Sequence, residues 1–177
     1  NRVLFAINRG SMNLLLSQDI TSRSRIIMNR NIKTRVEAIA PFLKYDGDPY
    51  IAAVGGRLYW IMDAYTTSSL YPYSEPYEGI NYIRNSIKVI IDAYDGTVNF
   101  YLIDGHDPVA ETYSRMFPGL FKSENELPDG FAEHLRYPEG IFDLQLQVYK
   151  KYHVTNPKIF YNREDEWIIA GEDPSSQ

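Results

Sequence analysis

The sequence predicts an α+β fold: an antiparallel four-stranded sheet made of two hairpins, with helices packed on one face. Two turn pairs, Gly55-Gly56 and Asp95-Gly96, predict the hairpins because each separates two runs of β-prone residues. Apolar residues that recur at helical spacing before the first hairpin and after the second predict the helices. We therefore expect one domain over residues 1–170, followed by a flexible tail or linker over residues 171–177.

Helical periodicity runs through the segment before the first hairpin. Apolar residues recur near helical spacing over residues 3–16, although Gly10 and Ser11 in their midst lower the helix propensity. The next apolar stripe is Ile32, Val36 and Ile39. Pro41 follows it, so we expect the helix to stop or kink there.

The first hairpin is predicted over residues 49–65, where two β-prone runs surround Gly55-Gly56. A two-residue turn sets the register, and the apolar cross-strand pairs are then Ile51 with Trp60 and Ala53 with Leu58. This apolar set could face a core.

The second hairpin is predicted over residues 87–103, with Asp95-Gly96 as a type I′ turn. A two-residue turn makes one face wholly apolar, by pairing Ala93 with Val98, Ile91 with Phe100 and Val89 with Leu102. The other face, with Asp92 opposite Asn99 and Lys88 opposite Ile103, is typical of a partly solvated sheet surface. We therefore expect Ile91 and Phe100 to be buried cross-strand neighbours.

Two further helices are predicted after the hairpins. Asp107-Pro108 is an N-cap followed by proline at the first helical position, and the helix ends near Phe117. Pro138 opens a second helix that extends to about His153. Its apolar stripe consists of Ile141, Leu144, Val148 and Tyr152.

Composition excludes several classes of function. The chain has 18 Lys and Arg against 23 Asp and Glu, a formal net charge of -5, so general attraction to nucleic acid or anionic lipid is not expected. The absence of cysteine excludes disulfides, thiolate metal sites and a cysteine nucleophile. No apolar run is long enough to span a bilayer, and no motif indicates a cofactor. Because the chain begins at Asn1 without a methionine, we expect residues upstream of it.

Two loops carry residues that could bind a metal ion. Asp46-Gly47-Asp48 and Asp104-Gly105-His106-Asp107 offer the oxygen ligands that Ca²⁺ prefers. Asp and Gly in these positions are also what turns and helix caps use, and EF-hand spacing is absent. We therefore predict that these residues serve turns and caps and that no metal binds.

Paired carboxylates could support acid hydrolysis. Asp63 and Asp92 each begin an Asp-Ala-Tyr tripeptide, and Glu75 or Glu78 could join them. A glycosidase needs two carboxylates about 5 to 9 Å apart across a cleft, a separation that only a structure can measure. The repeated tripeptide is equally typical of the polar faces of two similar strands.

The most distinctive compositional feature is a tyrosine-rich segment between the hairpins. The chain has 15 tyrosines, and Tyr71, Tyr73 and Tyr77 lie close together in a segment with two prolines and no periodicity. Because Tyr gives a large contact area at low entropic cost, the three residues are candidates for binding a glycan, a peptide or a protein. In the alternative, the segment is a crossover whose rings cover the sheet.

Several of these motifs resemble the large family known as uncharacterised protein family 0182. The resemblance is carried by long stretches spread over the chain, among them RLYWIMDAYT (57–66), YPYS (71–74), GINYIRNSIK (79–88) and DAYDGTV (92–98). Shorter stretches add to it: IAPFL (39–43), HLRYPE (134–139) and YHVT (152–155).

The resemblance implies a context and no activity. Members of the family are multi-spanning membrane proteins of bacteria and archaea with a large extracytoplasmic region, so this chain would be a soluble segment of that region. We expect a non-catalytic module that binds the membrane-embedded part of its own protein, an envelope glycan or another envelope protein through Tyr71, Tyr73 and Tyr77. The alternative is a hydrolase of cell-envelope polymers that acts through Asp63, Asp92 and Glu78.

Overall fold

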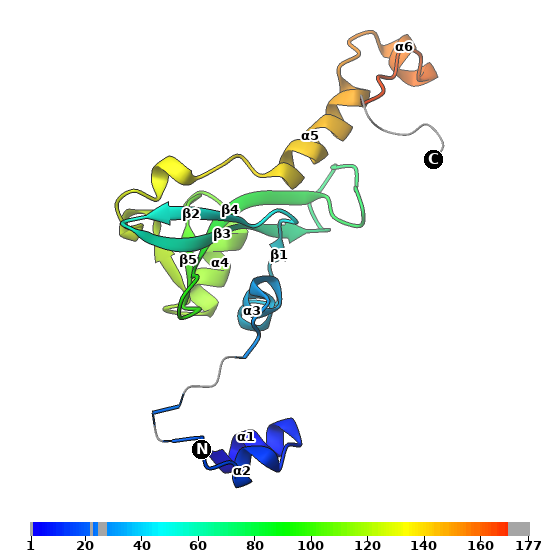
Figure 1. The fold of residues 1–177 in the computed structure, drawn as a ribbon. Helices are drawn as coiled ribbons and strands as arrows, with labels where there is room; N and C mark the ends of the chain where they lie inside the picture. Colours follow the sequence, from blue (N-terminus) through cyan, green and yellow to red (C-terminus); the bar gives the residue numbers. More distant parts are fainter. Residues whose placement is uncertain (1, 22, 25–27, 170–177) are drawn as a thin grey trace. The chain divides into compact units, whose positions relative to one another are not determined.

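The computed structural model describes residues 2–21, 23–24 and 28–169. The chain divides into two compact units, residues 1–30 and residues 31–177, and each is described by itself. Over the described residues the fold is α+β, with six α-helices and one open, mostly antiparallel sheet of six strands (Figure 1). The tail predicted for residues 171–177 lies outside the described residues.

The N-terminal unit contains α1 (Arg2–Arg9) and α2 (Asn13–Leu16), as the helical periodicity predicts. The break between them falls at Gly10, which has a positive φ of 61°. The Arg2 guanidinium donates hydrogen bonds to the carbonyls of Leu14 and Ser17, so it ties the start of α1 to the end of α2.

The second unit contains the sheet. Its strands are β1 (Lys44–Tyr45), β2 (Tyr50–Val54), β3 (Arg57–Ser68), β4 (Tyr82–Asp92), β5 (Val98–Leu102) and β6 (Phe121–Ser123). The order is β1-β3-β4-β5-β6, and β2 also pairs with β3, along the part of it that β1 leaves free. The predicted four strands are therefore correct as the centre of the sheet but incomplete, because β1 and β6 are too short to show a period-two pattern.

The helices of this unit are α3 (Ile32–Ile39), α4 (Pro108–Met116), α5 (Glu139–Tyr152) and α6 (Pro157–Asn162). Two single turns of 3₁₀-helix, η1 (Glu124–Glu126) and η2 (Ala132–His134), precede α5. Side chains cap three of the helices: Asn31 accepts from the Thr34 amide, Asp107 from Val109 and Asn156 from Lys158. The Asp107-Pro108 start of α4 and the Pro138 start of α5 are confirmed.

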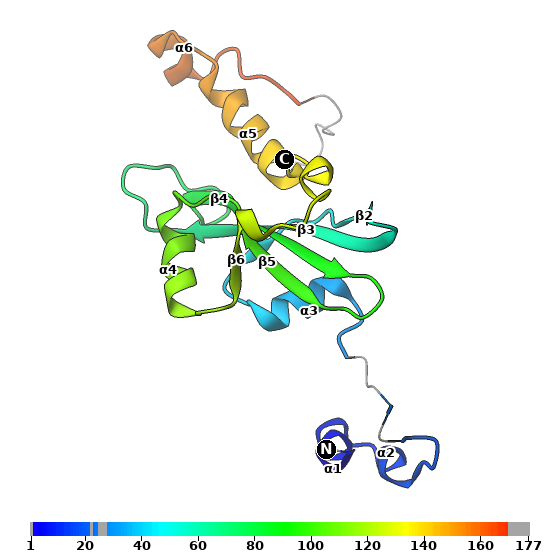
Figure 2. The same cartoon turned by 90° about the vertical axis from the view of Figure 1, so that its left-hand side faces the viewer.

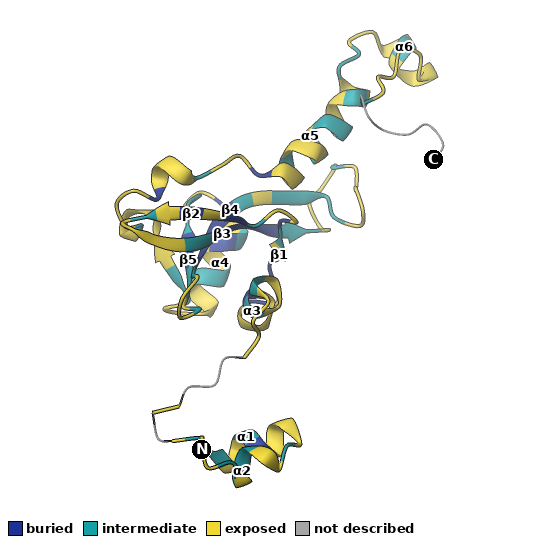
Figure 3. Cartoon of the chain, in the orientation of Figure 1, coloured by how far each residue is buried: buried dark blue, intermediate teal, exposed yellow. Residues whose placement is uncertain are grey.

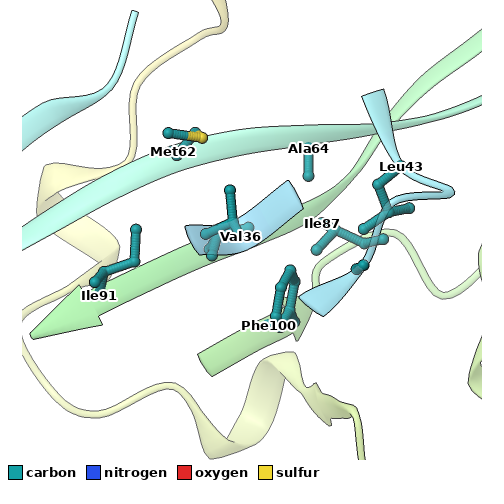
Figure 4. Close-up of a cluster of buried hydrophobic side chains, with 9 residues drawn as sticks. Val36, Leu43, Met62, Ala64, Ile87, Ile91 and Phe100 are labelled. Atoms are coloured by element: carbon teal, nitrogen blue, oxygen red, sulfur yellow. The ribbon is translucent and has the colours of Figure 1, made fainter. Parts of the chain in front are cut away.

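Both faces of the sheet are covered, whereas the sequence predicts helices on one face only. Figure 2 shows α3 on one side and α5, with the segment that leads into it, on the other. On the first side Val36 of α3 packs among Met62, Ile87 and Phe100 (Figure 4). On the second side Phe131 packs on a separate apolar cluster. The second cover lacks a helical period, which is why the sequence pattern does not reveal it.

The register of the second hairpin differs by two residues from the prediction. Phe100 pairs with Val89, and Ile91 pairs with Val98. The carboxylate of Asp92 accepts the amide hydrogens of Tyr94 and Asp95, and this side-chain turn lengthens the connection. A shift of two residues keeps every side chain on its face, so Ile91 and Phe100 are both buried, as predicted, but they are diagonal neighbours.

The opposite face of this hairpin is buried at its centre and half-buried toward its ends. Lys88 and its cross-strand partner Tyr101 are both buried. Tyr101 belongs to the apolar cluster around Phe131, so the segment after β6 excludes water from this part of the face. Asp92, Asn99 and Ile103 are half-buried. The predicted partial solvation therefore holds for these three residues and is wrong at Lys88.

The first hairpin has the predicted register, with Ile51 opposite Trp60 and Ala53 opposite Leu58. The face expected to be apolar is largely exposed, because only Trp60 of this set packs against the core beneath α3.

Candidate binding surface

The tyrosine-rich segment forms the connection between β3 and β4, and we call residues 69–81 the tyrosine loop. Asn81 fixes its base. The Asn81 side chain accepts the Tyr71 amide hydrogen at 3.0 Å and donates to the carbonyls of Tyr71 and Ser74 at 2.7 and 3.3 Å. The Asn81 side chain therefore supplies hydrogen bonds to backbone groups of the loop that have no strand partner.

The distal part of the loop is a small hairpin. Tyr77 and Ile80 exchange both backbone hydrogen bonds, at 2.7 and 3.0 Å. The two residues between them, Glu78 and Gly79, have positive φ angles of 48° and 82°, as a two-residue primed turn requires. The loop is therefore held by hydrogen bonds at both ends.

Three tyrosine rings project from this ordered backbone. Tyr73 is fully exposed, and Tyr71 and Tyr77 retain 55% and 44% of their accessible surface. Tyr71 also stacks on Tyr82 with 5.7 Å between ring centroids. The three rings are exposed, so the alternative in which these rings cover the sheet is wrong for them. Tyr65, at the start of the segment, is buried within β3.

Glu75 connects the tyrosine loop to α5. Its carboxylate accepts a hydrogen bond from the Tyr152 hydroxyl at 2.6 Å and lies 3.6 Å from the Lys151 ammonium. The Tyr152 hydrogen bond and the Lys151 charge lower the pKa of Glu75. The loop therefore meets the C-terminal end of α5 through a polar contact at the surface.

A cavity of about 330 Å³ lies where the loop meets α5 and α6. Its lining combines rings with charged groups of both signs: Glu75, Lys151, Tyr152, Val154, Phe160, Tyr161, Arg163, Glu164 and Glu166. Tyr152 and Phe160 form one wall, with ring centroids 5.4 Å apart. The cavity therefore presents both apolar and charged groups to solvent.

The exposed rings continue along α5 and α6. Trp167 stacks on His153 with centroids 3.9 Å apart, and Tyr149 contacts both rings. The helical stripe of α5 predicts a core-facing helix, yet no residue of α5 is buried. In Figure 3 the tyrosine loop and α6 are mostly coloured as exposed, and α5 alternates between the exposed and intermediate colours. The sequence does not reveal this extension, because an apolar stripe has the same pattern whether it faces a core or solvent.

We call the tyrosine loop together with α5 and α6 the aromatic surface. Besides Tyr71, Tyr73 and Tyr77, its exposed aromatic residues are Phe142, Tyr149, Tyr152, Phe160 and Tyr161.

The carboxylates of the hydrolase alternative do not converge. Asp63 pairs with Lys88 in the sheet, whereas Asp92 is bonded to Arg57 at 2.8 Å at the other end of β4. Four residues separate them along the paired strands, a distance of about 13 Å at 3.3 Å per residue. Glu78 lies in the primed turn of the tyrosine loop. Asp63 and Asp92 therefore pair with different cations at different positions in the sheet.

Asp63 and Lys88 form a buried ion pair, with 3% and 4% of their surfaces exposed. The Lys88 ammonium also donates to the Arg136 carbonyl at 3.1 Å. Burial raises the pKa of Asp63, and the hydrogen bond and charge of Lys88 oppose that rise. The pair joins β3 and β4 to the segment before α5, which indicates a structural role.

The first of the two loops considered as metal sites, residues 46–48, serves a turn. Asp46 accepts the Asp48 amide at 3.1 Å, the Gly140 amide at 3.2 Å and the buried Tyr65 hydroxyl. Burial opposes ionisation of Asp46, but these hydrogen bonds outweigh it and lower the pKa. Since Gly140 lies in the first turn of α5, Asp46 also anchors that helix to the sheet.

The second of these loops, residues 104–107, serves a turn and a helix cap. Asp104 accepts the His106 amide at 3.0 Å, and Asp107 caps α4. Asp107 is buried and accepts hydroxyl hydrogens from Thr66, Tyr82 and Ser86. Among the described residues no group of three or more His, Asp or Glu is placed to hold a metal ion.

A bulge brings Ser86 to Asp107. Ala64 pairs with Ile87 whereas Thr66 pairs with Arg84, so β4 has one more residue than β3 between these pairs. The extra residue lets Ser86 join Thr66 at the carboxylate while Ile87 remains in the core.

Comparison with known proteins places the chain in a family. The sequence profile described as "Uncharacterised protein family (UPF0182)" matches residues 1–177. The chain belongs to the UPF0182 family. A UPF0182 protein of Clostridium novyi is 58% identical over 170 residues, which cover 96% of this chain and 19% of that protein. UPF0182 proteins of Clostridium acetobutylicum and Clostridium kluyveri are 56% and 53% identical over the same coverage.

The chain thus spans about a fifth of the length of the curated UPF0182 relatives it matches. No solved structure matches it. Within residues 2–21, 23–24 and 28–169, none of the helices has the length and apolar character needed to cross a bilayer.

Proposed function

We propose that this chain is a non-catalytic binding module of a UPF0182 membrane protein, on the extracytoplasmic side of the cell membrane. Its aromatic surface binds the membrane-embedded part of the same protein. The observation that carries the proposal is the exposure of Tyr71, Tyr73 and Tyr77 on a loop whose backbone is already fixed.

The rigidity of the loop supports binding. Ordering a loop on association costs free energy, and the Asn81 bonds, the Glu78-Gly79 turn and the Glu75 contact have already ordered this one. Tyr contributes large contact area with few torsions to freeze, and it is enriched at interface centres.

The short length of this chain relative to the UPF0182 proteins supports a partner within the same protein. Because the chain matches 19% of its relatives' length, most of a UPF0182 protein lies outside this segment. A contiguous aromatic surface on a fragment of this kind is typical of a face that is covered in the whole protein. Exposed rings also stack on sugars, so an envelope glycan is the competing partner.

Hydrogen exchange tests the proposal directly. We would compare residues 69–81 in the 177-residue chain and in a full-length UPF0182 protein that carries this sequence. The proposal predicts slower exchange of the loop in the full-length protein, and the triple variant Tyr71→Ala, Tyr73→Ala, Tyr77→Ala should lose that protection. The melting temperature of the triple variant should stay nearly unchanged, because the three rings are exposed.

An exposed tyrosine elsewhere provides the control. Tyr94, which follows β4, retains 61% of its surface and lies outside the aromatic surface. The variant Tyr94→Ala should leave the protection of the loop intact. Equal loop exchange in chain and full-length protein would refute the proposal. Protection that appears only when purified envelope glycan is added would identify the glycan as partner instead.

A further inference from the structure

The formal charge of the chain conceals a strong asymmetry. Residues 1–30 contain five arginines and one aspartate, a net charge of +4. The remaining residues contain 13 Lys and Arg against 22 Asp and Glu, a net charge of -9. The boundary coincides with the division of the structure into two compact units. The N-terminal unit therefore has its own electrostatic character, opposite to that of the overall chain.

The same unit exposes aliphatic side chains. Val3, Leu4 and Ile7 lie at helical spacing on α1 and are all more than half exposed. Met12 and Leu16 add to this exposed set. A groove of about 580 Å³ follows the face and is lined by Leu4, Phe5, Ile7, Asn8 and Met28. Ala6, in contrast, is the buried residue of α1.

Hydrogen bonds hold the unit in a form that keeps this face outward. Arg2 is bound to the carbonyls of Leu14 and Ser17, and the Ser11 amide is bonded to the Ala6 carbonyl at 3.0 Å. Arg9, Arg23 and Arg30 are exposed. The unit therefore exposes both aliphatic and cationic side chains, with Arg9 on the side of α1 opposite Val3, Leu4 and Ile7, as in a helix that lies at a membrane interface.

We infer that the N-terminal unit docks on the surface of an anionic lipid bilayer. Its aliphatic side chains enter the boundary between headgroups and acyl chains, and its arginines meet lipid phosphates. The inference concerns a local surface, so it is compatible with the net charge of -5, which gives no general attraction to anionic lipid.

The positive charge and the exposed aliphatic side chains of the N-terminal unit together favour an anionic bilayer over other partners. A nucleic acid would match the arginines but would leave the aliphatic face in water. A second copy of the chain would cover the aliphatic face but would bring two units of charge +4 together. With eight residues, α1 is about 12 Å long, far short of a span, so the unit lies along the membrane surface.

Vesicle co-sedimentation of the 177-residue chain provides the test. We expect the chain to sediment with vesicles of phosphatidylcholine and phosphatidylglycerol at 7:3 and low salt, and at least tenfold less with phosphatidylcholine alone. High salt should weaken the partition into anionic vesicles by a similar factor, since lipid phosphates attract the arginines through screened charges. Failure of the chain to sediment with anionic vesicles at low salt would overturn the inference.

Substitutions within the unit are matched by substitutions outside it. The double variant Leu4→Ser, Ile7→Ser should bind anionic vesicles at least tenfold more weakly. Ile51→Ser, Leu58→Ser removes one Ile and one Leu that are 49% and 41% exposed in the first hairpin, and it should bind like the parent chain. If the hairpin variant lost binding to the same extent, the aliphatic face of α1 would not be the docking surface.

Charge variants keep the test valid even if the serine variant disturbs α1. Alanine at Arg9, Arg23 and Arg30 should weaken binding at least tenfold, whereas lysine at the same positions should retain it. Alanine at three exposed lysines of the second unit is the control and should leave binding unchanged: Lys44, Lys122 and Lys158. Equal losses in the arginine and lysine sets would refute the assignment.

Sedimentation velocity and a duplex DNA titration examine the competing partners. The inference predicts a monomer in solution and no DNA binding at physiological salt. A dimer that Leu4→Ser, Ile7→Ser dissociates, or DNA binding that the arginine variants abolish, would replace the bilayer with that partner.

Discussion

Removal of the ammonium group from the buried ion pair is the sharpest test of the sheet interior. Lys88→Met keeps most of the aliphatic length of the side chain but leaves the Asp63 carboxylate buried without its cation. The substitution also removes the donor to the Arg136 carbonyl. The change is therefore largely electrostatic.

The expected magnitude follows from burial. Removing one partner from a buried pair costs about 3 to 5 kcal/mol of unfolding free energy, because an uncompensated charge remains in a dry site. Both side chains are about 95% or more buried here, so the upper part of this range applies. Arg57→Met is the matched control, since its ion pair with Asp92 has an Arg57 side chain that is 51% exposed. That loss should be much smaller than the loss at Lys88, because water screens the exposed pair.

Urea denaturation at several pH values would measure the loss of unfolding free energy in Lys88→Met and in Arg57→Met. The pKa of Asp63 is raised in the folded chain, so its favourable contribution is complete below its ordinary value of 3.8 and is lost as pH rises through the folded pKa. Loss of the Lys88 ammonium raises that pKa further. The stability deficit of Lys88→Met should therefore be largest near pH 7 and shrink toward pH 4.

A second substitution separates charge from packing. Asp63→Leu combined with Lys88→Met removes both charges, and the double variant should be more stable than Lys88→Met alone. A Lys88→Met deficit below about 1 kcal/mol at pH 7 would refute the buried pair. A deficit that did not change between pH 7 and pH 4 would show that it comes from packing and not from Asp63.

Three further predictions concern the core, the helix cap and the loops. Phe100→Ala should lower the unfolding free energy by about 3 to 5 kcal/mol because the ring is 1% exposed, and a loss below about 1 kcal/mol in urea would contradict the core assignment. The pKa of Asp107 is lowered because hydrogen bonds from Ser86, Thr66 and others outweigh its burial, so its contribution is present above pH 3.8 and is lost as pH falls through the folded value. Asp107→Asn should therefore destabilise the chain at pH 7 and approach the parent chain below about pH 3.8, and a deficit that grew on acidification would reverse this assignment. The melting temperature should not change with EDTA or with millimolar Ca²⁺, whereas a shift of several degrees in either would establish a metal site.

Local chemistry predicted the elements that depend on neighbouring residues. Asp107-Pro108 begins α4 because an N-cap and a proline act within one turn of helix. Period-two alternation assigned Ile91 and Phe100 to one buried face, and a two-residue slip could not change this. Two prolines and a lack of periodicity predicted that Tyr71, Tyr73 and Tyr77 lie outside the strands, but their exposure was decided only by the tertiary structure.

Tertiary contacts decided the features that no local pattern contains. The Asp92 side chain competes with strand pairing for the turn amides, and so it lengthened the second connection. The cover over Lys88 comes from residues near Phe131 and Arg136, more than 40 positions along the chain and without a period of their own. The relative positions of Asp63 and Asp92 also depend on strand pairing. The sequence left a shared site open, whereas in the sheet the two residues lie four residue pairs apart.

The sequence by itself determined where α4 and α5 begin, that two hairpins form, which side of β4 carries Ile91, and the family to which the chain belongs, because these depend on residues close together or on long shared motifs. Only the tertiary structure decided that the centre of the second face of the sheet is buried and that Val148 and Tyr152 in the stripe of α5 remain exposed. A hydrophobic stripe shows which side of an element is apolar, but whether that side packs against the rest of the fold depends on residues distant in sequence.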